Sequence, residues 1–145
     1  MKKSPYPCMW FNNNAKQAVD YYCGIFPDSQ ILSENHMVIQ FLLSGTRYMA
    51  LNGGPQFTFN ESISFVIECK DQQEIDYYWE SLSKEGEEGR CGWLKDKYGV
   101  SWQIIPEHLG ALFNNPQTAQ YAGNAMMKMK KFIIKDLTKR ENIET

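Results

Sequence analysis

The feature that most constrains the fold of this chain is an internal repeat. Three pairs of segments match in the same order, the first two at a spacing of 56 residues and the third at 54: Cys8–Phe11 with Ser64–Ile67, Val19–Phe26 with Ile75–Leu82, and Gly45–Leu51 with Gly99–Ile105. One such match carries little weight, but three in one order at nearly one spacing indicate a duplicated module. Each copy is therefore expected to repeat the same succession of elements.

Each module is predicted to begin with a strand and a helix. Short apolar runs at Cys8–Phe11 and Ile63–Cys69 are typical of strands. Apolar side chains at helical spacing predict helices over Ala15–Phe26 and Gln72–Ser83, and Asp71 is a suitable N-cap for the second. The repeat places Tyr22 of the first helix over Tyr78 of the second, so we expect these two residues to pack equivalently.

Two hairpins complete the modules. Ser44-Gly45 is expected to connect strands at Met37–Leu43 and Thr46–Leu51. The turn Asp96–Gly99 is expected to connect strands at Cys91–Leu94 and Val100–Ile105. The fold class is therefore α+β, with one domain over residues 1–145 made of modules at about 5–52 and 61–105.

A third region, residues 106–145, is predicted to be a helical C-terminal tail. Asn115-Pro116 has the features of a helix start, since proline is favoured in the first helical position. Apolar residues then recur at helical spacing at Ala122, Met126, Met129 and Ile133. The polar end, Asp136–Thr145, is expected to fray.

Composition and charge exclude several classes of protein. With 43% hydrophobic and 22% charged residues the chain is expected to be globular, and a net charge of −2 argues against nucleic-acid binding. No apolar run reaches the roughly 20 residues of a membrane span, and Met1–Pro5 is not followed by the apolar region of a signal peptide. We therefore expect a cytoplasmic protein that contacts no membrane. Its four cysteines are expected to be reduced, buried thiols.

Several short motifs resemble one known family. They are Met9–Phe11, Phe26–Ser29, Ala50–Pro55, Cys91–Gly99 and Ser101–Gln103. The chain resembles the PhnB-like family, also labelled 3-demethylubiquinone-9 3-methyltransferase domains, of the glyoxalase/bleomycin-resistance/dioxygenase (vicinal oxygen chelate, VOC) superfamily. The resemblance implies tandem βαβββ modules, a homodimer and a cavity between curved sheets. It implies no settled reaction, because the family's activity is largely unassigned.

The resemblance also allows the metal site of the superfamily to be examined. Metal-using members take four ligands from the first and last strands of the two modules. Those positions fall here on Pro7, Ile63, Met49 and Gln103, or, with a slip of two residues, on Met9 and Phe65 in place of the first two. Of these side chains only Gln103 can bind a hard divalent ion, so we expect neither a metal nor another cofactor.

Strand alternation, combined with the superfamily geometry, suggests a ligand-binding cleft. Its predicted lining is Met9, Phe11, Met49, Leu51, Phe65 and Gln103. Trp102 and Ile104 would then face a helix, since neighbouring residues of a strand point to opposite sides. Such a cleft would be apolar with one amide to orient a ligand. The alternative, that these residues fill a core, stays open at this point.

Two further features have both a functional and a structural interpretation. The charged segment Lys84–Arg90 is expected to be a solvated turn, although it could cover a cleft. Trp93 and Trp102 could stack on a ligand, but buried tryptophans belong more often to a core. His36 and His108 are isolated from any nucleophile in the sequence, so no catalytic residue is predicted.

Three functions remain compatible with the sequence. The prediction is a metal-independent small-molecule-binding protein with its ligand in an apolar cleft and its reaction unassigned. The alternatives are a metal-dependent VOC enzyme (a lyase, isomerase or dioxygenase) and, following the family label, a methyltransferase. Whether the protein is an enzyme is therefore left open.

Overall fold

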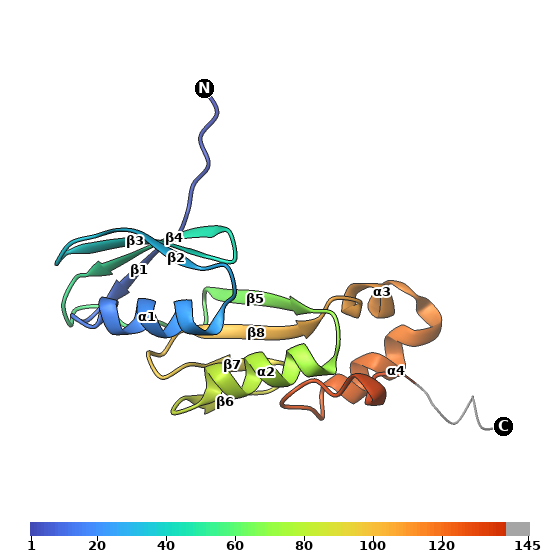
Figure 1. Cartoon of the computed structure of the whole chain (residues 1–145). Helices are drawn as coiled ribbons and strands as arrows, with labels where there is room; N and C mark the ends of the chain where they lie inside the picture. The colour runs from blue at the N-terminus through green and yellow to red at the C-terminus, as the bar shows by residue number, and fades with distance from the viewer. Residues whose placement is uncertain (139–145) are drawn as a thin grey trace. The chain divides into compact units, whose positions relative to one another are not determined.

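The computed structural model describes residues 1–138 and divides the chain into two compact units (Figure 1). The first unit is Met1–Phe59 and the second begins at Asn60. The division falls between the two modules predicted from the repeat. Each unit is described below by itself.

The first unit is a four-stranded sheet with one helix. Its elements in chain order are β1 (Cys8–Phe11), α1 (Ala15–Ile25), β2 (Gln30–Glu34), β3 (Val38–Leu43) and β4 (Thr46–Asn52). The strand order in the sheet is β1-β4-β3-β2, with β1 parallel to β4 and the other pairs antiparallel. Parallel pairing of β1 and β4 requires a long crossover, which α1, β2 and β3 provide.

The second unit repeats this arrangement and then continues into helices. Its elements are β5 (Ser64–Cys69), α2 (Gln72–Ser83), β6 (Glu87–Glu88), β7 (Trp93–Lys95), β8 (Ser101–Pro106), α3 (Leu109–Asn114), α4 (Pro116–Met126) and the 3-10 turn η1 (Ile134–Asp136). The strand order is β5-β8-β7-β6, with β5 parallel to β8. The predicted α+β fold of two tandem βαβββ modules with a helical C-terminal tail is confirmed.

One face of each sheet is covered by the helix of its own module (Figure 1). In the first unit the covered face carries the fully buried side chains of Phe11, Ile39 and Phe41, and Val19 and Tyr22 are the fully buried counterparts on α1. In the second unit Leu94, Trp102 and Ile104 are buried beneath α2. Burial of these apolar faces is the main force that holds each helix on its sheet.

The two helices do not present equivalent residues to their sheets. Tyr22 is completely buried, whereas Tyr78 is half-buried and its neighbour Trp79 is buried instead. The expectation that Tyr22 and Tyr78 pack equivalently is therefore wrong. The residue in α1 that corresponds to Trp79 is the small Cys23, so turning the indole inward buries more apolar surface in α2 than turning Tyr78 inward would.

The C-terminal tail departs from the predicted single helix. The helix α4 begins as expected, with Asn115 capping the backbone N–H of Gln117, but it ends at Met126. Met129 and Ile133 therefore lie outside it. The carbonyl of Met129 accepts a hydrogen bond from the backbone N–H of Cys91 at 2.9 Å, so the chain leaves the helix to pair with the second sheet.

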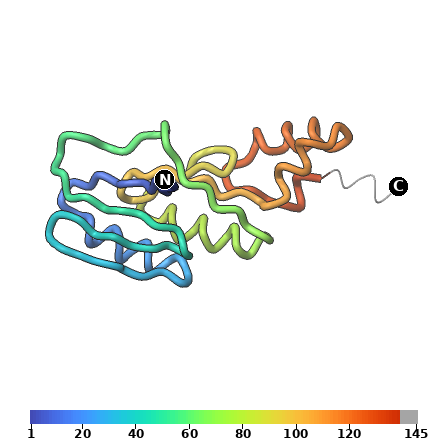
Figure 2. The backbone as a smooth tube through the Cα atoms, turned by 90° about the horizontal axis from the view of Figure 1, so that it is seen from above, coloured from blue at the N-terminus to red at the C-terminus, as the bar shows by residue number. Residues whose placement is uncertain are grey.

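This pairing brings the tail back onto α2 after it has passed beyond the end of β8 (Figure 2). The Gln72 side chain donates to the carbonyl of Phe132 at 2.8 Å and accepts from the backbone N–H of Ile134 at 2.8 Å. Phe132 and Leu137 are completely buried, so the predicted fraying does not begin at Asp136. The remainder of that prediction, residues 139–145, lies outside the described residues.

All four cysteines are free thiols, as expected, but they are not all buried. Cys69 is completely buried, Cys23 and Cys91 are half-buried, and Cys8 is exposed because it lies on the face of β1 that α1 does not cover. Within residues 1–138, no helix has the length and apolar character needed to cross a membrane.

Candidate functional site

Strand register divides the predicted cleft residues of the first unit between two faces. Met9 pairs with Ala50, so it lies on the face covered by α1, and it is 4% exposed. Phe11 lies on that same covered face. Met49 and Leu51 lie on the opposite, open face, because they alternate with Ala50 along β4.

The four residues therefore do not share one surface, contrary to the prediction. The superfamily geometry had placed Met9 and Phe11 on the same face as Met49 and Leu51. The parallel pairing instead sets Cys8 opposite Met49, and a shift of one residue reverses the face of every side chain in a strand. Cys8 and Trp10, which the prediction passed over, are the β1 residues on the open face.

The predicted residues of the second unit are divided in the same way. Phe65 pairs with Trp102, and their rings lie 5.4 Å apart on the face covered by α2. Gln103 lies on the open face, while Trp102 and Ile104 are buried beneath the helix, as strand alternation predicted. Of the six residues expected to line one cleft, Gln103 alone lies on the open face of the second sheet.

Strand register assembles a row of polar residues on this open face. Glu87 of β6 pairs with Lys95 of β7, Lys95 pairs with Ser101 of β8, and Ser101 pairs with Ser64 of β5. A second row contains Trp93, Gln103 and Val66. Directly opposed residues point to the same side of a sheet, so both rows belong to one surface.

A hydrogen bond and an ion pair fix side chains on this surface. The Gln103 Nε2 donates to the Ser64 Oγ at 2.9 Å, and the Gln103 Oε1 has no partner among residues 1–138. The Lys95 Nζ lies 3.1 Å from the Glu61 Oε2. The hydrogen bond from Lys95 keeps the pKa of the Glu61 carboxyl below its ordinary value.

Ser101 is the most unusual residue of the surface. It is 1% exposed, and its Oγ has no hydrogen-bond partner within the described part of the chain. A buried hydroxyl without a partner is destabilising, because it loses hydrogen bonds to water and gains none. An unsatisfied polar group in a native structure calls for an explanation, and a missing ligand is one.

A pocket of about 280 Å³ opens beside this hydroxyl. Its lining comes entirely from the second unit: Glu61, Glu87, Glu88, Gly89, Trp93, Leu94, Lys95 and Ser101. The volume lies just below the range of roughly 300–1,000 Å³ that is typical of small-molecule sites. The sequence pointed to Trp93 and to the segment that contains Glu87 as possible ligand contacts, but to Ser101 only as part of a family motif. The sequence signal that could have pointed to Ser101 is its position two residues before Gln103, which places both side chains on the same side of the strand.

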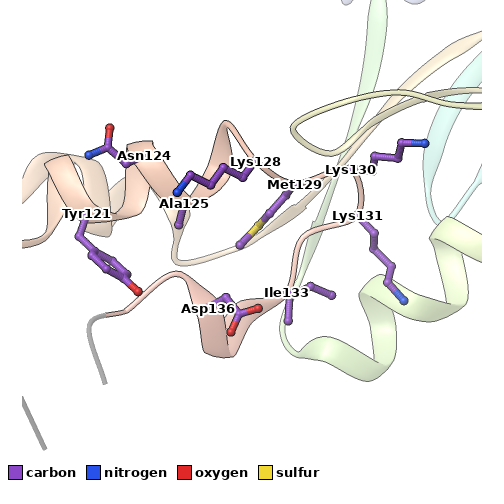
Figure 3. Close-up of a pocket in the computed structure, with 9 residues that line it drawn as sticks. All are labelled: Tyr121, Asn124, Ala125, Lys128, Met129, Lys130, Lys131, Ile133 and Asp136. Atoms are coloured by element: carbon purple, nitrogen blue, oxygen red, sulfur yellow. The ribbon is translucent and has the colours of Figure 1, made fainter. Parts of the chain in front are cut away.

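A larger hollow of about 680 Å³ lies against the C-terminal tail (Figure 3). Tyr121, Asn124 and Ala125 border it from α4, with Ile133 and Asp136 on the returning segment. Among residues 1–138, no buried side-chain polar atom lining this hollow lacks a partner, in contrast to Ser101 in the smaller pocket. Lys131, which also borders it, is already paired with Asp76 at 2.8 Å. The open face of the second sheet is therefore the stronger candidate site.

The donor set of this candidate site does not fit a divalent metal ion. Within residues 1–138, no three histidine, cysteine, aspartate or glutamate side chains come together in a way that could hold a metal. On the open face the central groups are the Gln103 amide and the hydroxyls of Ser64 and Ser101. Glu61, Glu87 and Glu88 border the pocket but form no such group among the described residues, and neutral amides and hydroxyls alone are poor ligands for a divalent ion.

Comparison with known proteins places the chain in a family. Residues 3–105 match the family model described as 3-demethylubiquinone-9 3-methyltransferase. The chain belongs to this PhnB-like family. Because the match ends before α3, the C-terminal tail of this PhnB-like protein lies outside the part that the family model describes. A comparison with curated proteins finds no match.

Solved structures agree with the family assignment. The PhnB protein from Bacillus cereus is 26% identical, covers 71% of this chain and 99% of its own length, and superposes with a TM-score of 0.65. Protein PA1353 from Pseudomonas aeruginosa is 14% identical over 72% of this chain and 98% of its own, with a TM-score of 0.59.

A third structure shows that the fold extends to the wider superfamily. The fosfomycin resistance protein FosX from Listeria monocytogenes, solved with Mn(II) and a sulfate ion, is 14% identical over 79% of this chain and 97% of its own, with a TM-score of 0.56. At that identity the likeness concerns the fold alone.

Proposed function

We propose that this PhnB-like protein binds a small organic molecule, without a metal ion, on the open face of the β5-β8-β7-β6 sheet. The observation that supports this proposal is the Ser101 hydroxyl, buried and unsatisfied beside a pocket. Close to it along the strand, the Gln103 Oε1 is a second acceptor without a protein partner among residues 1–138. A buried unsatisfied hydroxyl with a solvent-accessible amide oxygen on the same side of one strand is what a ligand would satisfy.

The proposed ligand-contacting residues are Trp93, Ser101 and Gln103. Met49 and Leu51 lie on the open face of the first sheet, and their predicted place in a cleft stays a prediction that is not part of this site. Met9, Phe11 and Phe65 are not included, because they lie on the helix-covered faces.

A fragment screen by NMR tests the proposal. In ¹⁵N-labelled protein the indole N–H signal of Trp93 is expected to shift with a bound fragment, while that of Trp102, whose Nε1 donates to Asp96 on the covered face, stays in place. Trp93→Phe and Trp102→Phe variants assign the two signals. If no fragment moves the Trp93 signal, or if fragments move only the Trp102 signal, the proposed site is wrong.

Matched variants separate this face from its counterpart in the first unit. Gln103→Leu is expected to weaken the binding of a fragment found in the screen by about 1–3 kcal/mol while leaving folding nearly intact. Gln40→Leu makes the same change on the open face of the first sheet, where the amide accepts from Arg47. Equal weakening by both variants would contradict a site on the second sheet.

Metal independence is tested on the untagged protein. Elemental analysis is expected to find no stoichiometric transition metal or Mg²⁺, and dialysis against a chelator should leave fragment binding unchanged. Stoichiometric metal, lost together with binding on dialysis, would instead favour the metal-dependent VOC enzyme.

The description of the matching family supports a second candidate function, that of a methyltransferase. This candidate predicts that S-adenosylmethionine binds the purified protein, which calorimetry measures directly. Failure to bind removes the candidate and leaves the small-molecule-binding proposal unaffected.

Two properties of the whole protein complete the proposal. The protein is proposed to be a homodimer, which light scattering after size-exclusion chromatography tests by its molar mass. It is also proposed to be cytoplasmic, which cell fractionation tests.

A further inference from the structure

We infer that the ligand of this site is a small organic cation, an amine or a guanidinium compound. The inference rests on the proposed function and adds the chemical class of the ligand. It depends on three properties of the pocket: its charge, the hydrogen-bonding groups it leaves unsatisfied, and the aromatic side chain that borders it.

The pocket contains three carboxylates and one ammonium group. Glu61, Glu87 and Glu88 border it, and among the described residues Lys95 is the one cationic side chain of its lining. Glu87 is the direct cross-strand neighbour of Lys95, and Glu61 forms the 3.1 Å ion pair with the same lysine. One lysine cannot neutralise both carboxylates, so the pocket keeps a negative charge that attracts a cation and repels an anion.

The hydrogen-bonding groups point to the same class. The unsatisfied buried group of the pocket is the Ser101 Oγ, which can accept through its lone pairs or donate its proton, and just outside the pocket lining lies the Gln103 Oε1, which can only accept. The strongest donor of the pocket, the Lys95 ammonium, already binds Glu61. A ligand rich in N–H donors therefore satisfies this surface better than one rich in acceptors, and an ammonium or guanidinium group has donors only.

The third property is the aromatic ring. Trp93 lies on the same face as Lys95 and borders the pocket. The face of an indole attracts a cation through its quadrupole, and tryptophan is the best of the aromatic side chains in this respect. A neutral or anionic ligand would gain no such attraction.

Three probes of nearly equal size test the inference. Benzylamine carries a cation at neutral pH, benzyl alcohol is neutral and benzoate is an anion. Benzylamine is expected to bind at millimolar concentrations, to shift the Trp93 indole signal and to bind more weakly as salt is raised. Benzoate is expected not to bind. Benzoate binding more tightly than benzylamine would overturn the inference.

Two glutamate variants test where the ammonium group of benzylamine binds. Glu87→Gln is expected to weaken benzylamine binding by up to about fivefold, as the loss of one exposed ion pair does. Glu80→Gln is the matched control, since Glu80 is an exposed carboxylate on α2, the helix of the opposite face. Equal effects of the two variants would show that benzylamine responds to net charge alone and would contradict binding in this pocket.

The Ser101→Ala variant tests whether the Ser101 hydroxyl binds the ligand or is only an unsatisfied group in the packing. Because the hydroxyl is buried and unpaired, its removal is expected to leave the Tm unchanged or raise it. The same variant is expected to weaken benzylamine binding about tenfold, as the loss of a hydrogen bond to a charged group does. A raised Tm with unchanged benzylamine affinity would contradict the assigned role of Ser101.

The inference and the proposed function fail by different results. If benzyl alcohol or benzoate shifts the Trp93 signal and benzylamine does not, the ligand is not a cation, but the site still binds small molecules. Absence of benzylamine binding overturns the inference whatever the other two probes do. The proposed function fails separately, when no compound of the fragment screen moves that signal.

Discussion

Asp96 shows how one buried side chain organises a turn. It is 3% exposed and lies between β7 and β8. Its Oδ1 accepts from the backbone N–H groups of Tyr98 and Val100, and its Oδ2 accepts from the Trp102 Nε1 at 2.9 Å. These hydrogen bonds connect the turn to the strand that carries Ser101 and Gln103, so Asp96 positions the candidate site from the opposite face.

Replacing Asp96 is expected to destabilise the protein strongly. Asp96→Ala leaves three buried or half-buried N–H donors without an acceptor, and we expect a loss of about 3 kcal/mol in the free energy of unfolding. Urea denaturation measures this loss. Asp20→Ala, which removes an exposed carboxylate paired with Lys16 on α1, is expected to cost less than about 1 kcal/mol. Comparable losses in the two variants would contradict the role given to Asp96.

The cysteines are expected to differ in reactivity towards a thiol reagent. Burial raises the pKa of the Cys69 thiol to about 12, and the side chain is inaccessible, so it should not react in the folded protein. Cys8 is exposed and should react first. Mass spectrometry of partly labelled protein identifies the modified residue. Cys8→Ser should remove the fast phase, whereas early labelling of Cys69 would contradict the structure.

At the scale of elements, a left-handed pair of residues joins β7 to the C-terminal tail. Cys91 and Gly92 have φ values of 55° and 83°. This conformation turns their backbone N–H groups towards the tail, where they donate to the carbonyls of Met129 and Lys130. A Cβ on Gly92 would lie 2.6 Å from the Phe132 ring and 2.8 Å from the Ile104 carbonyl oxygen. Glycine is therefore required for both its φ and its size.

Gly92→Ala is expected to be more destabilising than Gly45→Ala. Gly45 has nearly the same φ, 89°, but an added Cβ there meets nothing within 4 Å. Gly45→Ala should cost only the backbone strain, about 1 kcal/mol, and Gly92→Ala should add the steric clash to it. Denaturation midpoints of the two variants measure the difference. Equal losses would mean that the tail does not pack on Gly92 as described.

At the scale of the whole molecule, the tail belongs to the core of the second unit. The family match ends at residue 105, yet Phe132 and Leu137 are completely buried. Gln72, at the start of α2, holds the segment between them through the Phe132 carbonyl and the Ile134 backbone N–H. In this chain the tail therefore supplies part of the apolar core on which the second sheet depends.

Truncating the buried tail side chain tests this role. Phe132→Ala is expected to cost about 3–5 kcal/mol, as the loss of a fully buried phenylalanine does. Phe113→Ala is the control, because Phe113 is 37% exposed and should cost clearly less. Chemical denaturation compares them. A small loss in Phe132→Ala would show that the second unit is stable without the tail.

Sequence prediction succeeded best where local signals coincide. The bounds Gln72–Ser83 of α2 were predicted in full, because the apolar stripe and the Asp71 cap lie within the helix itself. The strands β2 and β6 were not delimited, because β2 is mostly exposed and β6 has two residues, so neither has a clear apolar pattern. The end of α4 was missed because pairing of Met129 with Cys91 outweighs helical spacing.

The sequence by itself determined the order of elements, through the repeat, and the opposite orientation of Trp102 and Gln103, through strand alternation. Only the tertiary structure decided which residues of different strands share a face. Alternation is a local property of one strand, whereas the pairing of Cys8 with Met49 depends on contacts between distant parts of the chain. For the same reason the unsatisfied Ser101 hydroxyl could not be foreseen, since its burial depends on neighbours from other strands.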